Sequence, residues 1–228
     1  MKFAVSQSNY IPWIGYFDLI SRVDTFVIYD TVQYTKNDWR NRNRIMTSLG
    51  PHWLSVPVRK LSLNQRINET EIANKIWAKK HWKTIEQSYK RSPFFENYRA
   101  ELRAIYSQEW LLLSDLNRAL IALICKFLDI KTRLICSSTL RHDGDKNLRL
   151  VSFAKQLGAN QYLSGPAAQS YLDESLFETA GISLEWMSYG PYEPYEQLSE
   201  EFSVHVSILD MLFNVGPDTT RYLGREQL

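Results

Sequence analysis

Two short apolar runs near the amino terminus, separated by a segment with helical spacing, constrain the fold more than any other feature. The runs at residues 2–6 and 25–30 are long enough for buried strands but too short for helices. Between them, apolar side chains recur with a helical period, which predicts a helix over 14–22. Strand, helix and strand in close succession form a βαβ unit, which favours a parallel sheet with a right-handed crossover.

The rest of the chain continues this alternation, except for a helical stretch in its middle. Further strands are predicted at 53–58, 132–136, 161–163 and 183–187, and further helices at 147–157, 171–179 and 205–213. Pro57 favours an edge position for the strand at 53–58. Three consecutive helices are predicted at 72–90, 94–107 and 110–128. The predicted fold class is α/β: a doubly wound, mostly parallel sheet, nucleotidylyltransferase-like or Rossmann-like, in a single domain over 1–228 with a helical insertion at about 72–128.

The composition argues against several classes of protein. A net charge of +2 gives no global attraction to nucleic acid or to a membrane surface. No apolar stretch reaches the ~18 uncharged residues that a membrane span needs, and we expect no signal peptide because the first residues resemble a strand. Cys125 and Cys136 lie in apolar runs, which predicts buried free thiols. We expect a cytoplasmic protein that binds no nucleic acid and has no membrane span, and that is compatible with a homo-oligomer.

The loops after the first two predicted strands carry more functional side chains than connecting loops need. Turn chemistry explains Gly, Pro, Ser and Asn, but it does not explain Gln7, Gln33, Lys36 and Trp39. Polar residues also follow the predicted strands at 132–136 and 161–163. Because the carboxyl ends of parallel strands meet at one edge of a sheet, we expect these four loops to form one ligand crevice.

Positive charge is concentrated in the second of these loops, at Lys36, Arg40, Arg42 and Arg44. Guanidinium groups bind phosphate or carboxylate through paired hydrogen bonds, and Trp39 offers a face on which a ring can stack. A solvated basic loop is the alternative interpretation. The chain has no Walker A or G-x-G-x-x-G motif. An anion site for nucleotide phosphates would therefore use side chains and the amino terminus of the first helix.

Other catalytic patterns are weak. His81 lies on a helical stripe with Trp77 and Ile85, and is either a packed core residue or a general base that faces the crevice. The turn at residues 142–145 contains one His and two Asp, which is little evidence for a metal, and no metal is predicted. The absence of a G-x-S-x-G elbow argues against a serine acyl-enzyme hydrolase.

Several motifs together resemble those of a known family. They are Q-x-N-Y-x-P-W-x-G-Y-F at 7–17, Y-D-x-V-Q-Y-x-K-N-x-W-x-N-R at 29–42, H-W at 81–82, Y-L-S-G-P at 162–166 and V-S-I-x-D-x-L-F-N at 206–214. With them, the chain resembles the WbqC-like protein family over nearly its whole length. Members of that family tend to be encoded with enzymes of bacterial surface-polysaccharide and sugar-nucleotide biosynthesis. The resemblance implies modification of an amino sugar for lipopolysaccharide or O-antigen biosynthesis.

A looser resemblance concerns the first strand and helix. Their layout, with Asp24 just before the second strand, is similar to that of nucleotidylyltransferases, which place a His-x-Gly-His motif at this helix. Trp13 and Tyr16 stand at the two histidine positions here. Neither side chain stabilises phosphate charge as imidazole does, so the likeness implies the fold and argues against nucleotidyl transfer.

The predicted function is transfer of an acyl or aminoacyl group to the amine of a nucleotide-linked amino sugar. Asp30 and His81 are the predicted catalytic bases for the ammonium proton. The predicted substrate-binding residues come from the loops: Gln7, Asn9, Tyr10, Tyr16, Gln33, Lys36, Asn37, Trp39, Asn41, Arg42, Ser164 and Gly165. The cofactor stays open between ATP with Mg²⁺ and an acyl donor. The alternatives are an ATP-using ligase or nucleotidyl transferase on the same crevice, and a non-catalytic module that binds a sugar nucleotide or a partner.

Overall fold

A five-stranded parallel sheet forms the centre of the protein. The computed structural model describes residues 1–224 except 60–61, 142–143 and 200. The strands lie in the order β5-β2-β1-β6-β7, and all neighbours pair in parallel. Their bounds are β1 (Lys2–Ser6), β2 (Thr25–Ile28), β5 (Arg133–Cys136), β6 (Gln161–Ser164) and β7 (Ser183–Trp186). The predicted α/β class, with a Rossmann-like doubly wound sheet, is confirmed.

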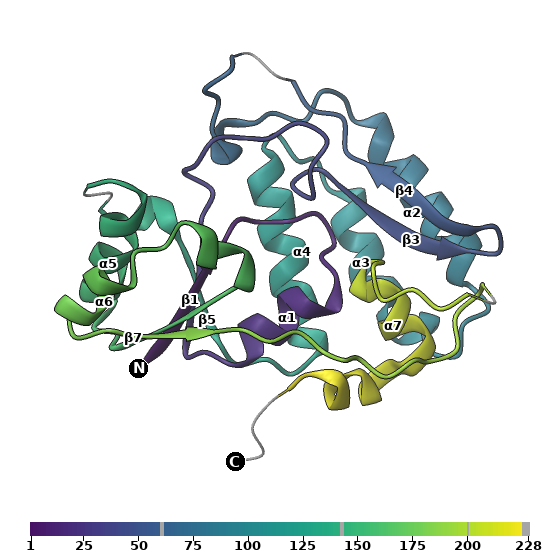
Figure 1. Ribbon diagram of the computed structural model, residues 1–228. Coiled ribbons are helices and arrows are strands. Elements are labelled where there is room, and N and C mark those ends of the chain that lie inside the picture. The colour runs from purple at the N-terminus through teal and green to yellow at the C-terminus, as the bar shows by residue number, and fades with distance from the viewer. Residues whose placement is uncertain (60–61, 142–143, 200, 225–228) are drawn as a thin grey trace.

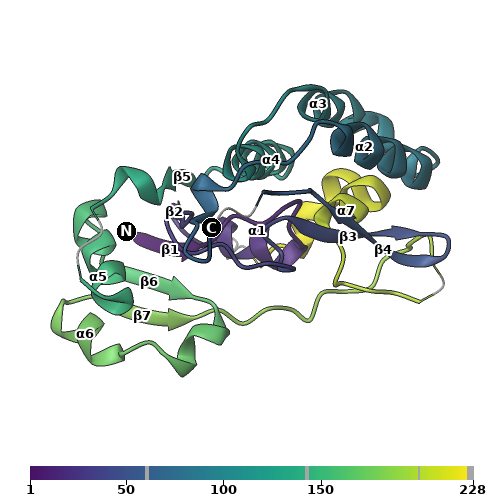
Figure 2. The ribbon, with the colours of Figure 1, turned by 90° about the horizontal axis from the view of Figure 1, so that it is seen from above.

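Alternate strand residues face two separate cores, which explains why the strands read as continuous apolar runs. On one face, Ala4 and Phe26 pack in the larger core, whereas Phe3 and Val27 on the other face pack in a smaller one. The larger core contains α1 (Ile14–Ser21), α2 (Ile76–Tyr89), α3 (Phe95–Ser107), α4 (Leu113–Phe127) and α7 (Ile208–Val215). The smaller core is covered by α5 (Lys146–Leu157) and α6 (Glu174–Thr179), on the other side of the sheet (Figures 1 and 2).

The predicted helices are present, with shifted starts. The segment before α2 forms isolated β-bridges, Val58 with Ile72 and Glu71 with Leu112, so the helix begins at Ile76 and not at residue 72. The predicted helix at 171–179 begins instead at Glu174, where the Asp173 side chain caps it by accepting a hydrogen bond from the Ser175 N–H at 3.1 Å. Short 3₁₀ turns cover Ile67–Glu69, Ser137–Thr139, Pro166–Ser170 and Gly216–Tyr222.

The strand predicted at 53–58 is wrong in its bounds and lies outside the main sheet. It is β4 (Gly50–Ser55), and it pairs antiparallel with β3 (Arg42–Thr47) in a separate two-stranded sheet. Arg42 and Arg44, predicted to belong to a basic loop, instead alternate with other residues along β3. The alternation is that of a half-buried strand, since Asn43 and Ile45 point inward at 2% and 0% exposure.

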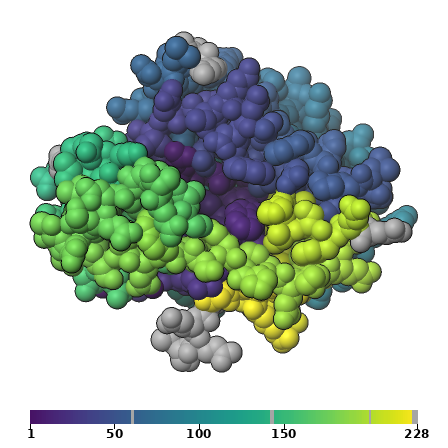
Figure 3. All heavy atoms as spheres, in the orientation of Figure 1, coloured from purple at the N-terminus to yellow at the C-terminus, as the bar shows by residue number. Residues whose placement is uncertain are grey.

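After β7 the chain crosses the molecule as an extended segment and returns to α7 (Figures 1 and 2). We call residues 187–199 the strap. Tyr192 anchors it by donating to Asp18 Oδ2 at 2.9 Å, and Tyr195 by donating to Asp210 Oδ2 at 2.7 Å. Figure 3 shows a hollow above the strap, with amino-terminal residues at its floor. Within the described part of the chain, each helix is too short or too polar to cross a membrane.

Candidate functional site

Hydrogen bonds join the loops after β1 and β2 at the carboxyl edge of the sheet. The Ser8 N–H donates to Asp30 Oδ1 at 2.9 Å, and the Tyr10 N–H donates to the Trp39 carbonyl at 3.0 Å. The Arg40 guanidinium donates to Asn9 Oδ1. The structure therefore brings these two predicted loops together. One pocket is lined by residues of the loop after β2, and a second by residues of both loops.

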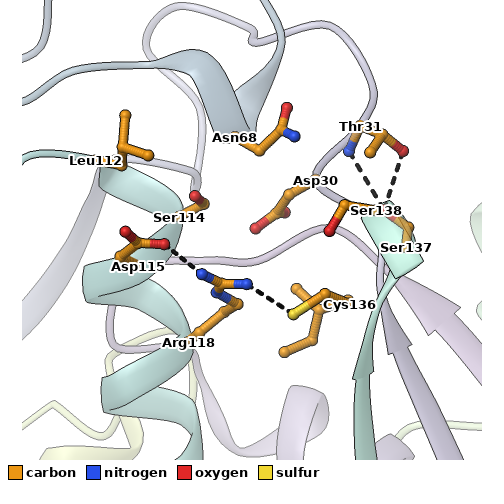
Figure 4. Close-up of a pocket in the computed structure, with 11 residues that line it drawn as sticks. Asp30, Thr31, Asn68, Leu112, Ser114, Asp115, Arg118, Cys136, Ser137 and Ser138 are labelled. Carbon is orange, nitrogen blue, oxygen red and sulfur yellow. Dashed lines mark hydrogen bonds and ion pairs between the residues drawn. The ribbon is translucent and has the colours of Figure 1, made fainter.

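The first pocket is polar and has a volume of about 170 Å³. It lies where β2 and β5 end, against the first turns of α4 (Figure 4). Its walls include Asp30, Asn68, Ser114, Arg118, Cys136 and Ser138. We call it the polar pocket.

Asp30 is the unusual residue of the polar pocket. Its side chain is only 5% exposed, and its carboxyl group points into the pocket on the side of Ser114 and Arg118 (Figure 4). Oδ1 accepts the hydrogen bond from Ser8, whereas Oδ2 is buried without a hydrogen-bond partner. Burial raises the pKa of this carboxyl group above its ordinary value. A carboxylate with a raised pKa and an unbonded oxygen is suited to accept a proton from a ligand.

Arg118 places a positive charge on the wall opposite Asp30. Its guanidinium bonds to Asp115, one turn earlier on α4, and donates from Nη1 to the Cys136 sulfur at 2.7 Å (Figure 4). These two bonds hold the group at the pocket. The polar pocket therefore presents a carboxylate, a guanidinium, a thiol and hydroxyl groups to a small ligand.

The second pocket, the aromatic pocket, has a volume of about 270 Å³ and is lined in part by the loop after β1. Trp13 and Trp39 form apolar walls, and Asn9 and Asn43 add amide groups. Trp13 is held by Tyr189 of the strap, with ring centroids 5.4 Å apart. Trp39 is 41% exposed, so a ligand can reach it. Two indole walls with a few polar groups suit a sugar or base ring.

The predicted basic cluster is divided. The Arg40 side chain is 14% exposed and is already bonded to Asn9. The Arg42 guanidinium lies over the Trp53 ring, 4.4 Å from its centroid, and donates to the Asn37 carbonyl. Lys36 is exposed. The structure does not gather these three cations around one point.

Two predicted ligand-binding tyrosines are buried behind the loops. Tyr10 is 0% exposed, and its hydroxyl lies 2.7 Å from that of Tyr106 and 2.8 Å from His81 Nδ1. Tyr16 is 4% exposed and donates to the Gln7 carbonyl at 3.0 Å. Tyr10, which was predicted to bind substrate, presents no accessible face to a ligand in this structure. Both phenols instead support the loop after β1.

His81 lies in the helical layer and lines neither pocket. It is 7% exposed and packs against Trp77 and Tyr10. Burial lowers its pKa to about 4, so the imidazole is neutral at neutral pH. This placement matches the packed-core interpretation.

The buried imidazole of His81 makes stability depend on pH. The pKa of His81 is about 4 in the folded protein, against 6.5 ordinarily. Between these two pH values, the imidazole therefore binds a proton in the unfolded chain but not in the folded protein. Its contribution is therefore complete above pH 6.5 and is expected to be lost as the pH falls toward 4, by up to ~3 kcal/mol. Urea unfolding of the wild type and of His81→Gln over this range measures it. Equal pH slopes for the two proteins would contradict the prediction.

The other predicted binding residues are engaged with the backbone or lie apart from the two pockets. Gln33 donates to the Leu63 carbonyl at 2.6 Å, and Asn41 donates to the Val56 carbonyl at 2.8 Å. Gln7 is half-buried and Asn37 is exposed. At the end of β6, Ser164 is 3% exposed, and a Cβ added at Gly165 would lie 3.5 Å from the Tyr189 hydroxyl. The strap thus approaches the fourth predicted loop.

Sequence reasoning missed Arg118, Ser114 and Asn68, which the structure places around Asp30. The signal available for Arg118 was a charged pair, Asp115 and Arg118, in the first turns of a strongly apolar helix. Among the described residues, no group of His, Cys, Asp or Glu could hold a metal ion. Residues 142–143 of the weak metal pattern lie outside the described residues.

Comparisons with known proteins agree with the motifs. The model of the WbqC-like protein family matches residues 7–222. A curated relative from Mycobacterium tuberculosis, described as uncharacterized protein Rv1507c, is 48% identical over 224 residues, which cover 97% of this chain and 97% of that protein. No solved structure matches the chain.

Proposed function

Because the chain belongs to the WbqC-like protein family, we propose that it transfers an acyl or aminoacyl group to the amine of a nucleotide-linked amino sugar. The observation that carries the proposal is the buried Asp30 carboxyl group, which lines the polar pocket and has one oxygen, Oδ2, without a hydrogen-bond partner. An amine reaches the protein as an ammonium ion and has to lose a proton before its nitrogen can attack a carbonyl carbon. Asp30 takes that proton.

In this proposal the two pockets bind different parts of the acceptor, the polar pocket its amine and the aromatic pocket its ring. Trp13 and Trp39 hold a ring of the acceptor in the aromatic pocket, and Asn9 bonds its hydroxyl groups. Asn9 is next to Ser8, which holds Asp30, so the two pockets are linked through adjacent residues. Lys36 and Arg42 are the proposed phosphate ligands, while Arg40 positions Asn9.

The substrate class is favoured by the surface-polysaccharide and sugar-nucleotide gene clusters in which family members tend to occur. Nucleotide-linked amino sugars of these routes carry a ring, a diphosphate and an amine. The ring and the amine have matching features here, indole walls and an unbonded carboxylate, and Lys36 and Arg42 are proposed for the diphosphate although they line neither pocket. We place the protein in the cytoplasm on the same ground.

A matched pair of acceptors tests this function. The protein is incubated with an acyl thioester and either UDP-glucosamine or UDP-glucose, with further nucleotide-linked amino sugars as a panel, and products are identified by mass spectrometry. We expect an amide product only from acceptors with a free amine. Turnover that requires ATP and Mg²⁺, with release of phosphate or pyrophosphate, would support a ligase instead. Tight binding without turnover under any donor would support a binding module.

Replacing Trp39 with Ala is expected to raise the dissociation constant of the acceptor about tenfold, because one wall of the aromatic pocket is lost. Tyr171→Ala is the control. Tyr171 is 48% exposed, much as Trp39 is, but it does not line the pocket, so its loss should change the affinity less than about twofold. Isothermal titration calorimetry measures both constants. Equal weakening by the two substitutions would contradict the assignment of Trp39.

A further inference from the structure

Cys136 is the last residue of β5 and lines the polar pocket. Cys136 forms no disulfide and is partly exposed. Strand β5 ends with it at the carboxyl edge of the sheet, beside Asp30, which follows the neighbouring strand β2. The other cysteine, Cys125, lies inside α4 and is buried, and burial raises its pKa to about 12. A ligand in the polar pocket can therefore reach Cys136 but not Cys125.

A guanidinium is bonded directly to the Cys136 sulfur. Arg118 donates from Nη1 to Sγ at 2.7 Å, and its bond to Asp115 keeps the group in that position. A fixed positive charge at hydrogen-bond distance stabilises the negative charge that develops on sulfur when the thiol reacts as a nucleophile.

Asp30 is an independent sign that a reacting ligand enters the same space. Its Oδ2 is buried and has no hydrogen-bond partner, and the residue as a whole is only 5% exposed. Figure 4 shows this carboxyl group and the Cys136 sulfur on the same pocket, with the Arg118 guanidinium bonded to the sulfur. A nucleophile and a proton acceptor thus share one small cavity of about 170 Å³.

We propose that Cys136 carries the acyl group as a thioester between an acyl-thioester donor and the amine acceptor. This inference rests on the proposed function and adds a covalent step to it. The Cys136 sulfur attacks the donor carbonyl carbon, the carbon–sulfur bond of the donor breaks, and the thiol proton leaves with the donor's thiol. Arg118 stabilises the charge on the sulfur during the attack.

The second half of the reaction returns the thiol. Asp30 takes the extra proton of the ammonium ion and passes it to solvent, and the neutral amine attacks the thioester carbonyl carbon. The new carbon–nitrogen bond forms, the carbon–sulfur bond to Cys136 breaks, and one of the two protons left on the attacking nitrogen moves to the sulfur, while the other stays on the amide nitrogen. The products are an amide, the free donor thiol, one proton and unchanged enzyme.

Acylation of the protein without an acceptor tests the covalent step. The full chain is incubated with the N-acetylcysteamine thioester of acetate, quenched in acid and analysed by intact mass and peptide mapping. We expect one acetyl group on Cys136, removable by neutral hydroxylamine, in the wild type and in Cys125→Ala. Cys136→Ser should carry no acetyl group that hydroxylamine can remove. Arg118→Gln should become acetylated at least about tenfold more slowly than the wild type. Circular dichroism confirms that each variant is folded.

The outcomes separate this inference from the proposed function. An acetyl group found only on lysines, or full amide formation by folded Cys136→Ser, would overturn the covalent step and leave the proposed function standing. An acylated Cys136 that no amino-sugar nucleotide discharges would support the covalent step and overturn the acceptor class. Acylation of Cys136 followed by discharge to the amine supports both.

Discussion

Replacing Asp30 with Asn is expected to lower kcat for amide formation by about 10²- to 10⁴-fold. Asparagine keeps the shape of the side chain and can still accept the hydrogen bond from the Ser8 N–H, but it cannot take a proton from the ammonium ion. Steady-state rates at saturating donor and acceptor measure the effect. The dissociation constant of the acceptor should change much less, since the ring contacts of the aromatic pocket are intact.

The stability of Asp30→Asn is the control for this experiment. Because burial raises the pKa of Asp30 in the folded protein, its contribution to stability is complete below the ordinary pKa and is lost as pH rises through the folded value. Removing the ionisable group should therefore leave the free energy of unfolding at neutral pH unchanged or higher. Near-wild-type turnover would remove Asp30 from the mechanism, and an unfolded variant would show that Asp30 is structural.

Replacing Asp210 with Ala is expected to lower the free energy of unfolding by ~3–5 kcal/mol, a large share of the stability of a protein of this size. Asp210 is 0% exposed on α7. Its carboxylate accepts hydrogen bonds from Tyr89 at 2.8 Å, Tyr195 at 2.7 Å and Gln197 at 2.8 Å. Alanine leaves these donors without their acceptor, and each unsatisfied buried group costs ~1–3 kcal/mol. Urea denaturation measures the change.

Tyr195→Phe is the matched control for Asp210. It removes one donor of the same cluster and leaves the others in place, so the expected loss is ~1 kcal/mol. Since Tyr195 and Gln197 belong to the strap, Asp210→Ala should also increase proteolytic cleavage within residues 187–199 before global unfolding. A loss below ~1 kcal/mol for Asp210→Ala would show that water satisfies the donors and that the cluster does not hold the strap.

The sheet was predictable because its signals are local. Phe26, Val27 and Ile28 form an apolar run since both faces of β2 are buried, and the helix over Ile14–Ser21 shows its period within eight residues. The hairpin was not predictable in the same way. Arg42 and Arg44 alternate with inward-facing Asn43, a polar residue that donates to the Ile11 carbonyl at 2.8 Å. A strand with a polar inward residue has the sequence pattern of a loop. It can be recognised as a strand only when the hydrogen-bond partner of that residue, here the distant Ile11 carbonyl, is known.

The sequence by itself determined the family, the parallel sheet, and the meeting of the loops after β1 and β2 at one edge, because strand direction decides where those loops lie. Tertiary structure alone decided which side chains face a ligand. Tyr10 is buried by contact with Tyr106, far along the chain, and Asp30 shares a pocket with Arg118 from a helix outside the βαβ unit. Burial and hydrogen-bond partners across such separations depend on how the layers pack, and no local pattern of residues records them.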